Sequence, residues 1–232
     1  MKSRINVFFK ISVGIPFLAC LSKNELAEIQ SVIVVKNYLK NEVILLAEEE
    51  ASYFYFILSG KVKVIQITES GKELMLAIHK RGDYFGEMSI LDGKTAPATI
   101  IALENSTIGF ISKDNFIKYI INNEKSLRQI IPLLCSRLRE AWSMLKIFAY
   151  ENAEDRIIAA LNIFSQKFGI REKRGTIIDI KLTHKDLANY TALSRETASR
   201  VIGILLKSGD IELIENKYFL LKPAFFEKVL FM

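Results

Sequence analysis

Three residues in the C-terminal third of the chain have side chains and a spacing suited to reading the edges of DNA bases. Arg195 and Glu196 open a predicted helix. Arg200 follows Glu196 by four residues, so Glu196 and Arg200 share a helix face, with Ser199 at its edge. Arginine can donate two hydrogen bonds to O6 and N7 of guanine, and glutamate can accept one from N4 of cytosine. An ordinary surface helix with a Glu–Arg pair would look the same, so the neighbouring elements must decide.

The residues before and after these side chains predict two helices joined by a tight turn. Thr183, with Asp186 three residues later, resembles a capping box and predicts the start of the first helix. Ser194 is a strong N-cap for a second helix over residues 195–208, which Gly209 ends. This arrangement is typical of a helix-turn-helix.

Short strands flank the two helices. Residues 211–214 and 218–221 predict two strands across a turn at residues 215–217, which would form a wing. Upstream, residues 155–168 have helical periodicity and residues 176–182 predict a strand. The C-terminal part therefore predicts a winged helix-turn-helix.

The N-terminal half has a different hydrophobic period. Between residues 41 and 112, short apolar segments alternate with glycine and charged residues. Residues 53–58 are aromatic and aliphatic, and residues 61–67 alternate polar with apolar, as a half-buried strand does. A hairpin turn at residues 69–72 leads to a return strand over residues 73–78. Such closely spaced strands predict a barrel, a roll or a sandwich.

A long helical segment joins the two parts. From residue 113 to 148 the period is helical, and Pro132 predicts either a kink or a helix start. A second register, through Ile130, Arg137 and Met144, is nearly as good as the first. The first register is compatible with packing on the chain's own core or with a dimer interface. Its members, spaced by four and three residues, are Leu127, Ile131, Leu134, Leu138, Ala141, Leu145 and Phe148.

Composition limits the classes of function. The formal net charge of +6 suits a nucleic-acid partner without requiring one. Cys20 and Cys135 are isolated, and His79 and His184 are the only histidines, so we expect neither a disulfide framework nor a metal site. The longest apolar stretch, residues 11–21, is too short to span a bilayer. We expect a cytoplasmic protein without a membrane partner.

Two motifs resemble the CRP/FNR transcription regulators. The segment SRETASRV, residues 194–201, resembles the recognition helix of that family, and GDYFGEMSILDG, residues 82–93, resembles its cyclic-nucleotide-binding domain. The resemblance implies an α+β chain of three parts. Residues 1–112 would form a cyclic-nucleotide-binding-like sensor domain, with N-terminal helices and an antiparallel β-roll of the double-stranded jelly-roll type. A dimerisation helix region over 113–150 and a winged helix-turn-helix over 151–232 would follow. It also implies a hinge near the end of the long helix.

The same resemblance implies partners and DNA-contacting residues. A homodimer would bind double-stranded DNA at a palindromic operator, and RNA polymerase would be a further partner. Arg195, Glu196 and Arg200 would read bases, and Ser199 does so at the matching position of some members. The start of the first helix would hold phosphates. The expected DNA-binding residues are Thr183, His184, Lys185, Ser194, Arg195, Glu196, Ser199 and Arg200.

The sensor motif departs from the pattern of the members that bind cyclic AMP. There, a glutamate binds the ribose and an Arg-Ser pair binds the phosphate, whereas this chain has Ala96 and Pro97 at the Arg-Ser positions. A buried phosphate without its counter-ion costs about 3–5 kcal/mol, so we expect no cyclic-AMP response. Glu87 should then be bonded to backbone or solvated. The expected degenerate pocket contains Gly86, Glu87, Met88, Ala96 and Pro97, with Ala141 and Trp142 at the adenine positions, where Trp142 could fill the space of a nucleotide.

Other sensing modes remain open, and the cofactor is unknown. Cys20 alone cannot hold the iron–sulfur cluster of oxygen-sensing members. His79 could bind haem, although a solvated histidine is the simpler interpretation. A cupin-type enzyme would need several clustered histidines in the roll, so we expect no enzymatic activity. A nucleotide-sensing module without a transcriptional role is a further alternative.

Overall fold

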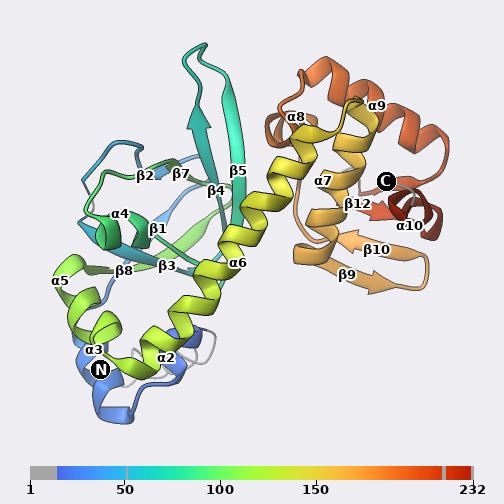
Figure 1. The fold of residues 1–232 in the computed structure, drawn as a ribbon. Coiled ribbons are helices and arrows are strands. Elements are labelled where there is room, and N and C mark those ends of the chain that lie inside the picture. The colour runs from blue at the N-terminus through green and yellow to red at the C-terminus, as the bar shows by residue number, and fades with distance from the viewer. Residues whose placement is uncertain (1–14, 51, 216–217, 231–232) are drawn as a thin grey trace. The chain divides into compact units, whose positions relative to one another are not determined.

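The computed structural model describes residues 15–50, 52–215 and 218–230 (Figure 1). The predicted turn at residues 215–217 and the first part of the apolar stretch 11–21 lie largely outside these residues. The chain forms two compact units. The first contains the described residues up to Lys72 together with Leu76–Arg139, and the second contains Glu73–Met75 and the described residues from Glu140 onward.

Two four-stranded sheets form the frame of the first unit, and their recorded pairings are antiparallel. The predicted antiparallel β-roll is therefore confirmed. One sheet has the order β1 (Val34–Tyr38), β8 (Ser106–Ser112), β3 (Tyr53–Ser59), β6 (Tyr84–Phe85). The other has the order β2 (Val43–Leu45), β7 (Thr99–Ala102), β4 (Lys61–Ile67), β5 (Glu73–Lys80).

Strand β3 is buried on both faces, which explains why its sequence does not alternate. Tyr55 and Ile57 belong to a core to which strands of both sheets contribute. Phe54 and Phe56 belong to a second core, which helices cover. Phe54 stacks on Phe116 with a centroid distance of 4.3 Å. The helices of this unit include α2 (Pro16–Ala19), α3 (Lys23–Val32), α4 (Glu87–Asp92), α5 (Lys113–Phe116) and the π-helical turn η1 (Ile117–Ile121).

The long helix α6 (Glu124–Ala149) runs without interruption through 26 residues (Figure 1). Pro132 lies inside it, so the predicted helix start near that proline is wrong. The proline side chain is on the exposed side, where water can bond the carbonyl that the missing N–H leaves free. Within the described residues, no helix combines the length and apolar character needed to cross a membrane.

The second unit is a winged helix-turn-helix, as predicted. Helix α7 (Ala153–Phe168) precedes the motif helices α8 (His184–Thr191) and α9 (Arg195–Lys207), and α10 (Pro223–Leu230) follows the wing. Its four-stranded sheet has the order β11 (Ile211–Ile214), β12 (Tyr218–Leu221), β10 (Gly175–Ile178), β9 (Gly169–Glu172).

The strand predicted over residues 176–182 is shorter than expected. It ends at Ile178, because the next backbone N–H groups bond within the chain: Ile180 N–H donates to the carbonyl of Ile178, and Leu182 N–H to that of Ile180. Both bonds turn the backbone out of the sheet. Strands β1 and β9 and helix α10 were not predicted.

Candidate functional site

Helix α9 has one buried face and one exposed face. Ala198, Val201, Ile202 and Leu205 are buried, at the spacing of an apolar helical stripe. Contacts of α9 with α7 and α8 place this stripe in the core of the second unit. The opposite side presents the predicted base-reading residues Arg195, Glu196 and Arg200, all of them exposed.

Local hydrogen bonds hold the turn before α9. The N–H of Asp186 donates to Thr183 Oγ1 at 3.1 Å and the N–H of Thr183 to Asp186 Oδ2 at 2.9 Å, which completes the predicted capping box. Ala192 has a left-handed backbone with φ of 56° and ends α8. Ser194 Oγ then accepts the N–H of Thr197 at 3.1 Å. The first turn of α9, which carries two of the base readers, is therefore fixed at its N-terminus.

A side-chain contact joins the two motif helices. His184 Nδ1 lies 2.9 Å from Ser199 Oγ. Burial lowers the pKa of His184, and the positive charge of Arg195 lowers it further, so the imidazole is neutral at pH 7. Ser199 therefore has a partner within the protein, and the structure brings two predicted DNA-contacting residues together. Thr183 and Lys185 are exposed beside them.

The glutamate of the sensor motif is enclosed by protein. Glu87 is the first residue of α4, and Gly86 before it has φ of +85°. A Cβ at Gly86 would lie 2.8 Å from the carbonyl oxygen of Tyr53, so the position requires glycine. The Glu87 side chain is only 1% exposed, and Arg137 Nη1 lies 3.1 Å from its Oε1. Arg137 also lies over the ring of Tyr84, 4.6 Å from its centroid, and donates to the Tyr84 carbonyl oxygen.

Arg137 supplies the counter-charge for this carboxylate. Burial raises the pKa of Glu87, and Arg137 opposes that rise. Among the described residues, no well-aligned hydrogen bond reaches either carboxylate oxygen, so the contact is an ion pair. The expectation that Glu87 is solvated is wrong, because its side chain is enclosed and has Arg137 as its counter-charge. Its own backbone N–H also lowers the pKa of the carboxyl. Arg137 belongs to the second helix register of the sequence analysis, but that register does not identify Glu87 as its partner.

The remaining predicted pocket residues differ widely in exposure. Ala96 is 1% exposed, lies in the core between the sheets, and exchanges backbone hydrogen bonds with Glu48 and Glu49. Pro97 is exposed, as is Met88. The other two predicted contacts, Ala141 and Trp142, are both exposed, Trp142 by 58%, so the tryptophan does not fill a pocket in this chain.

His79 differs from its prediction as well. It is 5% exposed, with its Nδ1 3.8 Å from Asp83 Oδ2, and is therefore not solvated. In the described part of the chain, no three His, Cys, Asp or Glu side chains are grouped to hold a metal ion.

The predicted dimer seam divides into exposed and covered positions. Ile131, Leu138 and Leu145 are 52%, 52% and 63% exposed. Leu134 packs against the helix-covered core of its own unit. Leu127 and Phe148 are half-buried and Ala141 is exposed. The exposed apolar strip of α6, as used below, consists of Ile131, Leu138, Trp142 and Leu145.

Comparisons with known proteins agree with this architecture. A cyclic nucleotide-binding domain model matches residues 35–123, and a Crp-like helix-turn-helix domain model matches residues 155–228. Regulatory protein HlyX of Actinobacillus pleuropneumoniae is 30% identical over 199 residues, 85% of this chain and 82% of that protein. The Cyclic AMP receptor protein of Thermus thermophilus is 30% identical over 177 residues, 76% of this chain and 79% of that protein.

A solved structure shares the fold. FixK2 from Bradyrhizobium japonicum has a TM-score of 0.72 at 20% identity, with coverage of 82% of this chain and 92% of that one. Three findings lead to one assignment: family models match both parts of the chain, relatives align along most of it, and its recognition helix is capped. The chain belongs to the CRP/FNR family of DNA-binding transcription regulators.

Proposed function

We propose that this regulator binds a palindromic DNA site as a homodimer and reads each half-site with Arg195, Glu196 and Arg200. The observation that supports this most directly is the exposed polar face of α9, held by a capped turn over an apolar core. Two recognition helices reach successive major grooves about 34 Å apart, which a two-fold dimer provides. The expected half-sites contain a G–A core of the TGTGA or TTGAT kind, because these three residues match the readers of such sites in the CRP/FNR family.

The dimer contact is assigned to the exposed apolar strip of α6. Ile131, Leu138 and Leu145 repeat every seven residues, and Trp142 follows Leu138 by four. This is the spacing of a coiled-coil seam, and large apolar residues more than half exposed favour a partner helix. A symmetric pair would bring each residue of the strip near its counterpart. RNA polymerase is a further proposed partner, and the cytoplasm the proposed compartment.

The sensor unit is proposed to work without cyclic AMP. The phosphate-binding arginine and serine are replaced by Ala96, which lies in the core, and Pro97. The acid that would bind the ribose is paired with Arg137. The two relatives described above have equal identity to this chain although only one is named for cyclic AMP, so identity alone selects no effector. We also propose that the protein is not an enzyme.

Arg200→Ala should weaken binding to the preferred site by about 1–3 kcal/mol and relax specificity at one base position. Fluorescence anisotropy with the preferred half-site and its single-base variants measures this. Lys185→Ala is the matched control, because loss of a phosphate contact should weaken all sites about equally. A uniform loss for Arg200→Ala would contradict the base-reading role.

Leu138→Glu should give monomers that bind the palindrome poorly, because the dimer would bury an unpaired carboxylate. Analytical ultracentrifugation at micromolar concentration tests this. Lys125→Glu places the same charge on an exposed position of α6 outside the strip and should stay dimeric. If Leu138→Glu remains a stable dimer, the strip faces something else.

Cyclic AMP at about 1 mM should change neither the melting temperature nor the affinity for DNA. A ligand that binds only the folded state stabilises it by mass action, so differential scanning fluorimetry is a direct test. A rise of several degrees would show that another group holds the phosphate.

Arg137→Met should destabilise the sensor unit by about 3–5 kcal/mol at pH 7, because Glu87 would stay buried without its counter-ion. Burial already raises the pKa of Glu87, and loss of Arg137 raises it further. A carboxyl with a raised folded-state pKa is less destabilising when protonated, so the deficit should shrink as the pH falls through that pKa.

Urea unfolding between pH 5 and 7 measures this dependence. Adding Glu87→Gln to Arg137→Met should recover much of the loss and remove its pH dependence. If the deficit were the same at every pH, with or without Glu87→Gln, Arg137 would act by packing alone.

A further inference from the structure

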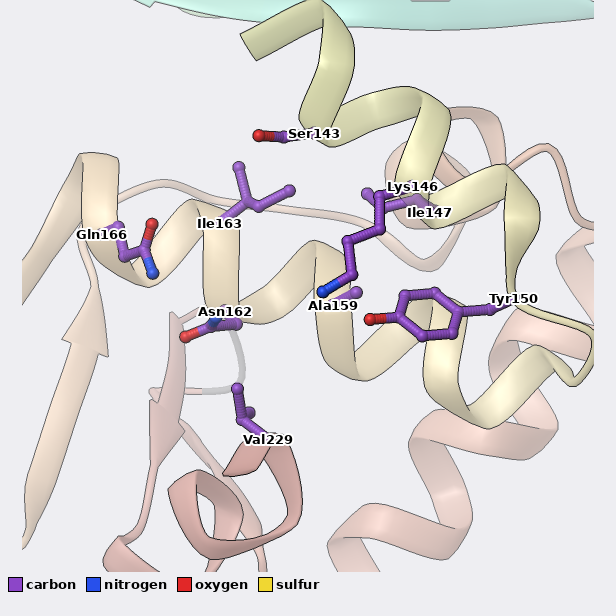
Figure 2. Close-up of a pocket in the computed structure, with 9 residues that line it drawn as sticks. All are labelled: Ser143, Lys146, Ile147, Tyr150, Ala159, Asn162, Ile163, Gln166 and Val229. Carbon is purple, nitrogen blue, oxygen red and sulfur yellow. The ribbon is translucent and has the colours of Figure 1, made fainter. Parts of the chain in front are cut away.

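A cavity of about 200 Å³ lies in the second unit, among α6, α7 and α10 (Figure 2). It is separate from the sensor motif and from the DNA-contacting face of α9, and all its lining residues belong to this one unit. The last turns of α6 contribute Lys146, and Tyr150 directly follows the helix. Helix α7 contributes Asn162, Ile163 and Gln166, and α10 contributes Val229.

Polar contacts hold α6 and α7 together on either side of the cavity. At one end, Lys167 Nζ lies 3.0 and 3.1 Å from the two carboxylate oxygens of Glu140. At the other, the Arg156 guanidinium donates to the carbonyls of Tyr150 at 2.9 Å and Phe148 at 3.2 Å. These two sets of contacts, called the two ties below, fix the spacing of the helices. Between them α7 presents the small side chain of Ala159, so the space stays open.

The lining is positive and rich in hydrogen-bond donors on part of its surface. Among the described residues that line it, Lys146 is the only charged one, and none carries a carboxylate. Figure 2 shows the Lys146 ammonium and the Tyr150 hydroxyl pointing into the same space. In the described part of the chain, no acid forms an ion pair with Lys146, whose recorded contact is the Tyr150 ring at 5.8 Å. The Asn162 and Gln166 amides add further donors.

The rest of the lining is apolar, through Ile147, Ile163 and Val229. A cation and neutral donors beside apolar walls suit a ligand with one anionic group and an apolar body. A volume of about 200 Å³ suits a small ligand.

We propose that this cavity binds small amphipathic monocarboxylates, with the carboxylate at Lys146 and Tyr150 and the apolar body against Ile163 and Val229. The site adjoins the joint between the long helix and the first helix of the DNA-binding part. Its face on α6 is rotated by about 100° from the exposed apolar strip, because Ser143 and Lys146 each follow a strip residue by one position.

A bound acid would contact both α6 and α7 and so favour the arrangement of these helices that fits it best, and α7 packs on α9. The acid therefore acts as an effector of DNA binding. This regulatory step rests on the proposed function, whereas binding to the cavity does not.

Binding is tested on the full-length protein without DNA, using hexanoate and benzoate as probes. Trp142, the sole tryptophan, precedes the lining residue Ser143 and reports on the site by fluorescence, and isothermal titration calorimetry gives the affinity. At least one acid should bind with a Kd of about 1 mM or tighter and raise the melting temperature. Its amide, hexanamide or benzamide, should bind at least about tenfold more weakly, since it lacks the charge.

Two lysine variants locate the site. Lys146→Met keeps most of the side-chain volume and should weaken binding at least about tenfold, whereas Lys125→Met, on the same helix but outside the cavity, should bind as the wild type does. Ala159→Phe should fill the cavity and abolish binding while the protein still melts cooperatively. The proposal is overturned if neither acid binds at about 20 mM, if amide and acid bind alike, or if Lys146→Met retains full affinity.

The regulatory step has its own measurement. The bound acid should shift the affinity for the palindromic site several-fold in the wild type and in Lys125→Met, and not in Lys146→Met. Unchanged DNA affinity with a saturated cavity would overturn the regulation and leave the binding site standing. Failure of the protein to bind any palindrome would instead refute the proposed function, and the titrations without DNA would be unaffected.

Discussion

A carboxylate removed from water must find a positive charge, and the need of Glu87 for Arg137 determines how α6 lies on the sensor unit. An unpaired buried charge costs several kcal/mol, more than most single packing contacts contribute. With Arg137 turned toward Glu87, Ile130 is placed one heptad earlier on the same helix face, where it is 1% exposed. If the helix rotated about its axis, an apolar residue would face Glu87 in place of Arg137.

The position of Arg137 also selects what α6 exposes. Residues rotated by about 100° from it, Leu138 among them, face outward, and Ile131 and Leu145 follow at intervals of seven. The buried ion pair and the exposed apolar strip are therefore two results of one helix register. The proposed dimer face depends on an interaction made within a single chain, and the ion pair joins α6 directly to α4.

The local elements of the DNA-binding part could be predicted from the sequence because each has a short-range cause. Thr183 and Ser194 cap their helices by hydrogen bonds three residues away, and both predicted starts are correct. The partner of Glu87 could not be found in this way, since it lies 50 residues along the chain and only the fold brings it near. Pro132 misled the prediction for a related reason: its position on the solvent side of α6 makes an interior proline tolerable, and sequence alone does not give that side. Strand β9 begins directly after α7, without the turn signal that separates other elements.

The two ties between α6 and α7 decide where a signal can act. Glu140 and Phe148 belong to α6 and Tyr150 directly follows it, and their contacts with Lys167 and Arg156 lie inside the second unit. The end of α6 is thus part of the DNA-binding unit, and any influence of the sensor unit along the helix must pass the point near Arg139 and Glu140 where the units divide. A ligand between the two ties acts beyond that point. The ion pair of Glu87 already holds the sensor unit to its part of α6. A change in the contacts of Lys167 or Arg156 could therefore move α9 relative to the end of α6 while the sensor unit keeps its structure.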